Sequence, residues 1–459
     1  MITLTSMNHK KKTGTSLICL VLGLACIAVL PVWMNYDIIS MDGAFQYVPS
    51  AALFLQGDVM GALARPQLPL FPFLMASLSW VTGADLELSG RLISAASFII
   101  ACLGLFKLSE LLFQNRWIAL ISVVFLISNR ELLGRSVDCL KESLQICFVI
   151  WGNYYILRGI DREDTRRKTH ISLGTVLLIL GTLVRTTTAF FLLAWLAIWT
   201  FRKRQGLIGR IIILVSPLLV LALLVVFYPD LKMFKRKGLA VVYLVSQWSG
   251  FWPMMKGSMD FLRDFFATGN YLAVLFGFHT LYSIKKDLYP IHVCIVLVLF
   301  FIVLSVLGWT SGRYILAPVI WLYPLAAYGV YETVNRGRKA FKVLAVITLI
   351  SCPVLWLDKA IQQPDPDKVA RKDAGQWILA QAGPHQEIAT NRERLIFYAQ
   401  GRMVALKSLK ADEEIKKIIA VDTMHEGGTE VADQLLKRGI EPDMRFRSIA
   451  VYMQQIPGA

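Results

Sequence analysis

Residues 37–72 of the chain read DIISMDGAFQYVPSAALFLQGDVMGALARPQLPLFP, and the interpretation of the whole sequence starts from this stretch. It is acidic and proline-rich, and it lies between apolar segments at 17–35 and 91–113. In a protein with several membrane spans, an aspartate one short loop outside the first span stands at the boundary between water and lipid. There it can act on a substrate whose tail stays in the bilayer. Asp42 is therefore the first candidate functional residue.

The composition indicates a polytopic membrane protein. Hydrophobic residues make up 56% of the 459 positions, charged residues 17%, and the mean hydropathy is +0.54, which excludes an ordinary soluble protein. A helix needs about 20 mainly apolar residues to cross the hydrocarbon core, and fewer when it is shielded by protein. We therefore predict an all-α membrane domain with about 11 transmembrane helices. The candidate segments are 17–35, 91–113, 117–131, 139–158, 171–184, 186–201, 208–228, 269–284, 289–308, 314–332 and 340–357.

The net charge of +16 follows from the distribution of basic residues along the chain. These residues gather in alternate short loops, at His9–Lys12, Arg158–Lys168, Arg202–Arg210, Lys285–Lys286 and Arg336–Lys342. This is the positive-inside pattern, which places the N-terminus in the cytoplasm and, after eleven spans, the C-terminal tail outside. Membrane topology thus explains the charge, and no nucleic-acid partner is expected.

A second, smaller domain is expected after the spans. Residues 364–367, Pro-Asp-Pro-Asp, mark a polar linker after which the density of apolar residues falls. We predict a membrane domain over 1–357 and an extracytoplasmic α/β domain over 358–459. In the latter, helical and strand patterns alternate. The helices are expected at 367–382, 392–400 and 429–438, and the strands at 387–390, 417–422 and 446–453.

The loop after the first span carries the candidate catalytic residue Asp42, with Tyr47 nearby. A carboxylate at this depth can take a proton from an attacking hydroxyl or amine while a lipid-linked phosphate departs. General-base assistance of this kind is typically worth about 10²–10⁴-fold in rate. The alternative is that Asp42 caps the amphipathic, interfacial helix expected over 44–55. The residues alone leave both interpretations open.

Further charged residues lie on the same predicted side of the membrane. Asp138 lies in NRELLGRSVDCLKE (129–142), where six charges crowd fourteen residues, and ionisable groups close to a span are often functional. Arg185, and Arg313 followed by Tyr314, carry guanidinium groups that match phosphate oxygens in bidentate geometry. The alternatives are an interfacial salt-bridge cluster for Asp138 and snorkelling to the headgroup layer for the two arginines.

Two further sets of residues complete the candidates. The long segment 228–268 mixes aromatic residues with a basic cluster that includes Lys235 and Arg236, a combination that suits anionic lipid headgroups. His279 and His292, in or beside spans, are interpreted as packing or interfacial residues and not as ligands. The sequence carries no nucleotide-binding signature, so an activated sugar is expected to arrive on a lipid.

An ordered series of segments resembles a known family. The series is DGAFQY, RPQLPLFPFLMA, GRLISAASFIIACLGLFKLSELLF, the region of Asp138, GTLVRTTTAFFLL and GRYILAPVIWLYPLAAYGV. Together these segments resemble the GT-C glycosyltransferases that use polyprenyl-phosphate sugars, which include the protein O-mannosyltransferases and the lipid A aminoarabinose transferases. The resemblance covers most of residues 17–335. No single motif is sharp, and the order of the segments carries the likeness.

The resemblance implies a GT-C-like fold and an inverting sugar transfer from a polyprenyl-phosphate donor to a protein, lipid or glycan. It implies that Asp42 is, or positions, the catalytic base and that Asp138 supports the site. It further implies that Arg185 and Arg313 hold the lipid phosphate. The residues that would complete the substrate site are Tyr47, Tyr314, Lys235 and Arg236. Many relatives carry an acidic pair where this chain has Asp42-Gly43, so a role for a divalent metal is left open and no other cofactor is implied.

The expected location is a bacterial cytoplasmic (inner) membrane, with the active site and the C-terminal domain on its outer face. Two alternatives stay open: a flippase for lipid-linked glycans or another transporter, and a glycan polymerase of the cell envelope. A transporter is expected to place polar residues along a path across the bilayer. In this sequence the informative charges gather on one side, which favours an active site at the membrane surface.

Overall fold

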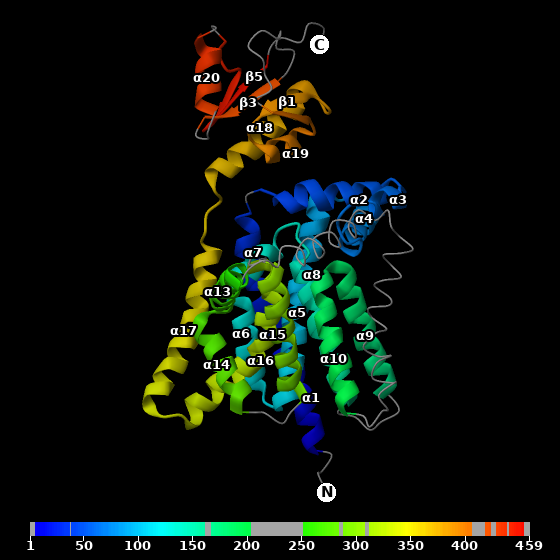
Figure 1. Cartoon of the computed structure of the whole chain (residues 1–459), viewed down its shortest axis with the longest axis vertical. Coiled ribbons are helices and arrows are strands. Elements are labelled where there is room, and N and C mark those ends of the chain that lie inside the picture. Colours follow the sequence, from blue (N-terminus) through cyan, green and yellow to red (C-terminus); the bar gives the residue numbers. More distant parts are fainter. Residues whose placement is uncertain are drawn as a thin grey trace. The chain divides into compact units, whose positions relative to one another are not determined.

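The computed structural model describes residues 5–36, 38–160, 167–202, 251–283, 288–307, 312–405, 418–423, 428–437 and 440–453 (Figure 1). The chain forms two compact units, and the N-terminal loop contributes to both. One unit comprises Met1–Met34 and Gln46–Ile361, and the other comprises Asn35–Phe45 and Gln362–Ala459. Within the second unit, the amide of Ile39 donates a hydrogen bond to the hydroxyl of Tyr398 at 3.1 Å. The domain boundary expected at 357/358 stays a prediction.

The first unit consists of helices (Figure 1). They are α1 Thr5–Met34, the π-helix η1 Gly43–Tyr47 on the border between the units, α2 Val48–Leu55, α3 Val59–Leu63, α4 Leu70–Thr82, α5 Leu86–Phe113, α6 Arg116–Ile127, α7 Arg130–Ser136, α8 Glu142–Ile160, α9 Arg167–Val184, the 3₁₀ helix η2 Thr186–Thr188, α10 Ala189–Arg202, α13 Phe251–Gly269, α14 Tyr271–Ser283, α15 Leu288–Leu307, α16 Gly312–Arg336 and α17 Lys339–Ala360. Ten of the eleven segments predicted to span the membrane fall on these helices, and the remaining one, 208–228, lies outside the described residues.

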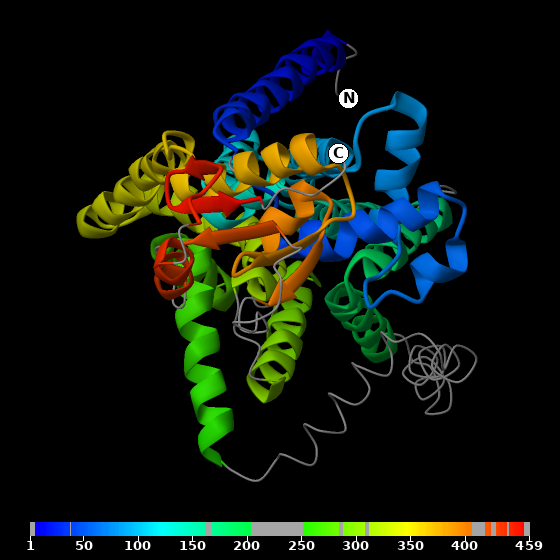
Figure 2. The same cartoon turned by 90° about the horizontal axis from the view of Figure 1, so that it is seen from above.

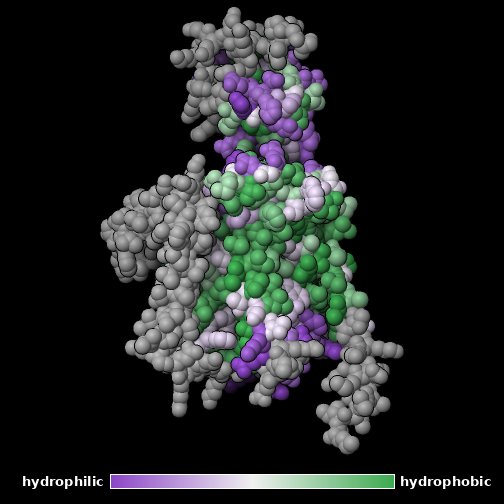
Figure 3. Space-filling view, turned by 90° about the vertical axis from the view of Figure 1, so that its right-hand side faces the viewer, coloured by the Kyte–Doolittle hydropathy of each residue, from purple (hydrophilic) through white to green (hydrophobic). Residues whose placement is uncertain are grey.

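The lengths and apolarity of these helices confirm a multi-pass, all-α membrane unit. Among the described residues, five helices are long and apolar enough to cross a membrane, on α1, α5, α15, α16 and α17. Figure 3 shows hydrophobic residues over most of the height of the described helices, with hydrophilic residues towards their lower end. Exposed apolar side chains of α17, such as Val346, Ile350 and Val354, are suited to lipid.

The segment predicted to span the membrane over 117–131 is not one continuous helix. Helix α6 ends at Ile127, and α7 starts at Arg130 with a bend of 71° between the two axes. The side chain of Asn129 caps the new helix, because its Oδ1 accepts a hydrogen bond from the amide of Leu132 at 2.9 Å. The bend turns the charged segment from Arg130 onward out of the line of α6.

Helices α8 and α9 form a closely packed antiparallel pair. A Cβ on Gly174 would lie 2.5 Å from the backbone oxygen of Gly152, which is closer than a real Cβ approaches. The contacts run from Gly181 against Phe148 at one end to Gly159 against Ile171 at the other. Small residues let membrane helices approach each other closely. The start of α8 and the end of α9 therefore lie at the same end of the pair.

A buried polar network joins α8, α10, α15 and α16. The indole of Trp321 donates to His292 Nδ1 at 3.1 Å, and His292 Nε2 lies 3.2 Å from the backbone oxygen of Phe191. Because Nδ1 accepts, Nε2 is the nitrogen that carries the proton and donates to Phe191. Trp195 packs on the imidazole with 4.4 Å between ring centroids and donates to Asn153 at 2.5 Å. His292 is thus a packing residue, as expected from the sequence.

Replacing His292 with phenylalanine is expected to lower the stability of the first unit. The change leaves the Trp321 indole and the Phe191 carbonyl buried without their partners, and each loss costs about 1–3 kcal/mol. The measurement is the thermal midpoint of the purified protein in detergent, followed by size-exclusion chromatography. His279→Phe is the matched control, because His279 is exposed on α14. Equal midpoints for the two variants would contradict the network's role.

The second unit is a small α/β domain, and the expected order of elements is confirmed. Its elements are α18 Pro366–Ala382, β1 Glu387–Thr390, α19 Glu393–Ala399, β2 Arg402–Ala405, β3 Ile418–Asp422, α20 Gly428–Lys437, β4 Met444–Phe446 and β5 Ile449–Tyr452. The sheet order is β2-β1-β3-β5-β4, in which β1 runs parallel to β2 and β3, whereas β5 is antiparallel to β3 and β4. The strands β2 and β4 were not predicted.

The two faces of this sheet carry different helices (Figure 2). Ile388, Ile418 and Val451 face a core formed with α18 and α19. Their neighbours in sequence, Ala389 and Ile419 among them, face α20 and its buried Leu435. This alternation is the period of two that a strand buried on both faces requires.

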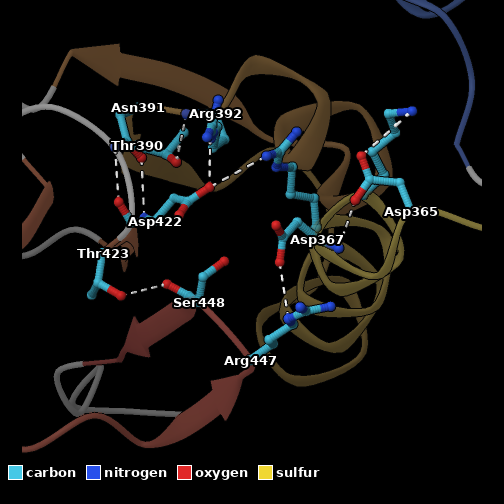
Figure 4. A network of polar contacts seen from close by, with 11 residues as sticks. Asp365, Asp367, Thr390, Asn391, Arg392, Asp422, Thr423, Arg447 and Ser448 are labelled. Carbon is cyan, nitrogen blue, oxygen red and sulfur yellow. Dashed lines mark hydrogen bonds and ion pairs between the residues drawn. The ribbon is translucent and has the colours of Figure 1, made fainter.

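The buried carboxylate of Asp422 lies where β1 and β3 end, at the carboxyl ends of these two parallel strands (Figure 4). Asp422, with a side chain 1% exposed, accepts a hydrogen bond from Arg392 Nε at 2.7 Å and lies 3.5 Å from Arg371 Nη2. Its backbone exchanges two hydrogen bonds with the side chain of Asn391, at 3.1 and 3.3 Å. These contacts join both strands to α18 and to the start of α19.

Asp422→Asn is expected to destabilise the second unit by about 3–5 kcal/mol, because it leaves two largely buried guanidinium groups without their counter-ion. The measurement is the rate of limited proteolysis within residues 362–459 of the full-length protein. Asp373→Asn, which changes an exposed carboxylate of α18, is the control and should be cleaved at the parental rate. Parental resistance of Asp422→Asn would show that the ion pairs contribute little.

Candidate active site

Asp42 lies in a short helical segment that continues into the π-helix η1. It is half-buried. The amides of Gly43 and Ala44 are bound by Ser40, through its Oγ at 3.2 Å and its backbone oxygen at 2.9 Å. At these two amides the capping function belongs to Ser40, not to Asp42. Single π-helical turns occur frequently at functional sites, so the local backbone is compatible with a catalytic role for Asp42.

The candidate residues are divided between the two units. Asp42 belongs to the second unit, within Asn35–Phe45. The other described candidates belong to the first unit, and they are Tyr47, Asp138, Arg185, Arg313 and Tyr314. Lys235 and Arg236 lie outside the described residues.

Asp138 lies in the turn between α7 and α8, which α5 holds in place. Arg91 Nε donates to the backbone oxygen of Val137 at 3.0 Å, and Ser94 Oγ donates to that of Leu140 at 2.6 Å. Asp138 Oδ1 accepts a hydrogen bond from the amide of Cys139 at 2.7 Å. The carboxylate is half-buried, and its backbone position is fixed from both sides.

Arg185 takes part in a buried ion pair. It lies between α9 and η2, and its Nη1 is 3.1 Å from Glu142 Oε1, the first residue of α8. The side chains of Arg185 and Glu142 are 6% and 3% exposed. Arg135 Nη1 lies 3.7 Å from the same Glu142 oxygen. Snorkelling to the headgroup layer, the alternative considered for Arg185, is therefore wrong.

Tyr314 lies close to two guanidinium groups, those of its sequence neighbour Arg313 and of the distant Arg185. The Cζ atoms of Arg185 and Arg313 are 4.5 and 5.0 Å from the centre of its ring. Arg313 Nη2 also donates to the Tyr314 hydroxyl at 3.3 Å. Arginine over an aromatic face is held by attraction to the ring's electron density. The structure thus brings together three of the candidate residues.

Tyr47 lies at the end of η1 and is almost fully buried, 2% exposed. Its ring packs edge-on against Phe71, with 5.3 Å between centroids, and Lys141 Nζ lies 5.4 Å from its centre. Lys141 directly precedes Glu142 in the chain. Tyr47 is therefore joined, through its neighbour Lys141, to the charged segment at the start of α8.

Three charged residues of this region were not singled out as site residues from the sequence. They are Arg135, Lys141 and Glu142. The sequence carried a signal for them, because they belong to the six charges within 129–142. That pattern does not reveal that Glu142 and Arg135 meet Arg185, which follows α9.

The described residues hold no group of three or more His, Cys, Asp or Glu side chains that could bind a metal ion. Glu142, one of the carboxylates of this region, is partnered by Arg185 and Arg135. We derive no step that depends on a divalent cation.

Comparisons with known proteins show which fold the chain has. A family model described as dolichyl-phosphate-mannose-protein mannosyltransferase matches residues 64–230. The crystal structure of ArnT from Cupriavidus metallidurans in the apo state matches 96% of this chain and 98% of its own, with a TM-score of 0.63 and 13% sequence identity. The chain shares the fold of ArnT. The GT-C-like fold that the sequence resemblance implied is thereby confirmed.

Two other solved structures have bound lipid phosphates. ArnT bound to undecaprenyl phosphate matches 95% of this chain and 98% of its own, with a TM-score of 0.63 and 12% identity. The archaeal oligosaccharyltransferase AglB from Archaeoglobus fulgidus, in complex with an inhibitory peptide and a dolichol-phosphate, matches 86% of this chain and 64% of its own, with a TM-score of 0.54 and 13% identity. A search among curated proteins finds no match to the sequence.

Proposed function

We propose that the protein is a membrane glycosyltransferase that transfers a sugar from a polyprenyl-phosphate-linked donor to a protein, lipid or glycan acceptor. The observation that carries the proposal is the placement of Arg185 and Arg313 around Tyr314, in a chain with the fold of ArnT. ArnT has been solved with undecaprenyl phosphate bound, which supports a polyprenyl phosphate as the lipid partner here.

The two arginines would bind the phosphate of the donor and stabilise it as it leaves. A guanidinium group presents paired donors that match two phosphate oxygens, and it keeps its charge at every physiological pH. Negative charge builds up on the phosphate as the bond to the sugar breaks. Fixed cations in a site with little water stabilise that charge far better than water does. The burial of Arg185 favours this role.

Asp42 would act as the general base. In this step the acceptor oxygen or nitrogen attacks the anomeric carbon, and the bond from that carbon to the phosphate oxygen breaks. The phosphate keeps the bonding electron pair, and the Asp42 carboxylate receives the proton of the nucleophile. Attack from the face opposite the phosphate inverts the configuration at the anomeric carbon. Asp138 would support the site from the fixed turn before α8.

The remaining candidates would complete the substrate site. Tyr314 would orient the two arginines, and Tyr47 would contact the substrate beside Lys141. Lys235 and Arg236 stay predictions for contacts with lipid headgroups. We place the enzyme in the cytoplasmic (inner) membrane, with a cytoplasmic N-terminus and with the active site and the second unit on the outer face. The positive-inside distribution of basic residues supports this orientation.

The experiment that tests the function is mass spectrometry of lipid-linked sugars and envelope glycans in cells with and without the protein. We expect a polyprenyl-phosphate sugar to accumulate in the deletion strain and one glycan modification to disappear, which would identify donor and acceptor together. Loss of long glycan chains with accumulation of their lipid-linked units would instead indicate a polymerase. Unchanged glycans with altered uptake of a small solute would indicate a transporter and overturn the proposal.

A further inference from the structure

Glu142 is a buried carboxylate in the membrane unit to which the proposed mechanism assigns no function. Its side chain is 3% exposed, and one oxygen faces two guanidinium groups, those of Arg185 at 3.1 Å and Arg135 at 3.7 Å. The other oxygen, Oε2, is buried and accepts no hydrogen bond from any residue that the structure describes. Burying such a group is costly, and apolar residues in its place are often as stable or more so. Stability alone is therefore a weak reason for its presence.

The position of Glu142 relates it to the proposed phosphate site. The Arg185 side chain contacts Glu142 through Nη1 at 3.1 Å, and its Cζ lies 4.5 Å from the centre of the Tyr314 ring. Glu142 thus fixes one edge of the guanidinium group. A phosphate bound to another edge of the same group would lie about 8 Å from the Glu142 carboxylate, given ordinary hydrogen-bond lengths on both sides.

Other charged groups lie near this pair on neighbouring elements that the structure describes. Helix α7 contributes Arg135 and Glu131, which form an ion pair with each other. The residue before α8 is Lys141, and α16 contributes Arg313 beside Tyr314. Loss of the Glu142 charge would therefore leave a site with one more net positive charge and with its arginines still present.

The charge of the site matters because the proposed reaction changes the charge of the phosphate. The donor is a phosphodiester with one negative charge. Once the sugar is transferred, the lipid product is a phosphomonoester, which carries nearly two negative charges above its second pKa of about 6. An arginine site without a counter-ion would bind this product more tightly than the donor and would release it slowly.

We propose that Glu142 is a positioning residue that holds Arg185 against Tyr314 and limits the positive charge of the phosphate site, so that the dianionic lipid product is released. The inference rests on the proposed function, because it assumes that Arg185 binds the lipid phosphate. The length and the charge of the Glu142 side chain have separate effects in this proposal, and each can be changed without the other.

The test measures the affinity of the purified full-length protein for undecaprenyl phosphate and for its methyl diester at pH 8. The monoester carries about two charges at this pH and the diester one. Glu142→Gln keeps the shape but removes the charge, and we expect it to raise the preference for the monoester about thirtyfold, the effect of one unit charge at this separation in a partly buried site. Glu142→Asp keeps the charge but shortens the reach, so it should weaken both ligands and leave the preference within about twofold of parental.

Two further variants make the result specific. Arg135→Gln combined with Glu142→Gln restores the net charge and should return the preference to the parental value. If Glu142→Gln alone fails to fold, the test still applies to the double variant and to Glu142→Asp. Both of these variants should then show the parental preference for the monoester over the diester. Glu110→Gln is the remote control, since it removes a carboxylate paired with Lys107 and Arg116 near the far end of α5.

The outcomes distinguish this inference from the proposed function. Suppose that the parental protein binds both ligands. If Glu142→Gln then has the parental preference for the monoester, or if the double variant departs from that preference, the inference about Glu142 is wrong and the proposed function stands. If the parental protein binds neither ligand, the proposed function fails and the inference with it. A higher preference in Glu142→Gln alone supports both.

Discussion

Asp42→Asn is expected to abolish sugar transfer while the protein is still made and inserted into the membrane. Asparagine has nearly the same shape, but it cannot accept the proton of the attacking nucleophile. Loss of a general base typically lowers the rate by about 10²–10⁴-fold. The measurement is transfer by the purified variant, with the polyprenyl-phosphate sugar that accumulates in the deletion strain as the donor.

Asp58→Asn is the matched control for this result. Asp58 lies in the same loop and caps α3, where its Oδ1 accepts a hydrogen bond from the amide of Gly61 at 2.8 Å. Asparagine caps helices about as well as aspartate, so this variant should transfer sugar at the parental rate. Parental activity in Asp42→Asn would refute the catalytic assignment of Asp42.

Arg185→Gln is expected to have the second largest effect. We expect a loss of about 10²–10³-fold in transfer rate, the range seen when one fixed donor to a developing negative charge is removed. Binding of undecaprenyl phosphate should weaken in parallel. Arg185→Lys should retain part of both, because lysine keeps the charge but not the paired donors. The measurements are the rate of transfer and the dissociation constant of the lipid phosphate.

The buried partner of Arg185 requires its own control. Arg185→Gln leaves Glu142 with Arg135 as its remaining cationic partner in the described contacts, and this could unfold the site. The double variant Arg185→Gln, Glu142→Gln removes both charges and keeps two groups that can hydrogen-bond. If the double variant folds and binds undecaprenyl phosphate as tightly as the parental protein, Arg185 does not hold the phosphate.

Much of the fold could be predicted from the sequence because long apolar runs specify membrane helices directly. The break after α6 was missed, since Ser128 and Asn129 do not interrupt the apolar run strongly, and it is the cap on Leu132 that starts a new helix. In the second unit, β2 and β4 were missed because both are edge strands. The residues of β4 are mostly exposed, so the strand lacks the apolar pattern that marks β3 and β5.

The candidate site was predictable residue by residue but not as an arrangement. Arg185 is conspicuous as a charge between two apolar segments, and Arg313 precedes another. Their meeting at Tyr314, and the pairing of Arg185 with Glu142, depend on how α8, α9 and α16 pack. No local pattern encodes contacts between residues so far apart in the chain.

The close packing of α8 against α9 also determines which changes the chain can tolerate during evolution. Gly152 and Gly174 fix the two helices lengthwise, and Arg185 lies eleven residues beyond Gly174. One residue inserted in that interval would turn Arg185 by about 100° around the helix and move it by about 1.5 Å along the axis, away from Glu142. Substitutions at exposed apolar positions such as Val176 and Ile179 carry no such penalty. Related chains should therefore vary at the exposed positions of this interval but conserve its length and its closely packed Gly181.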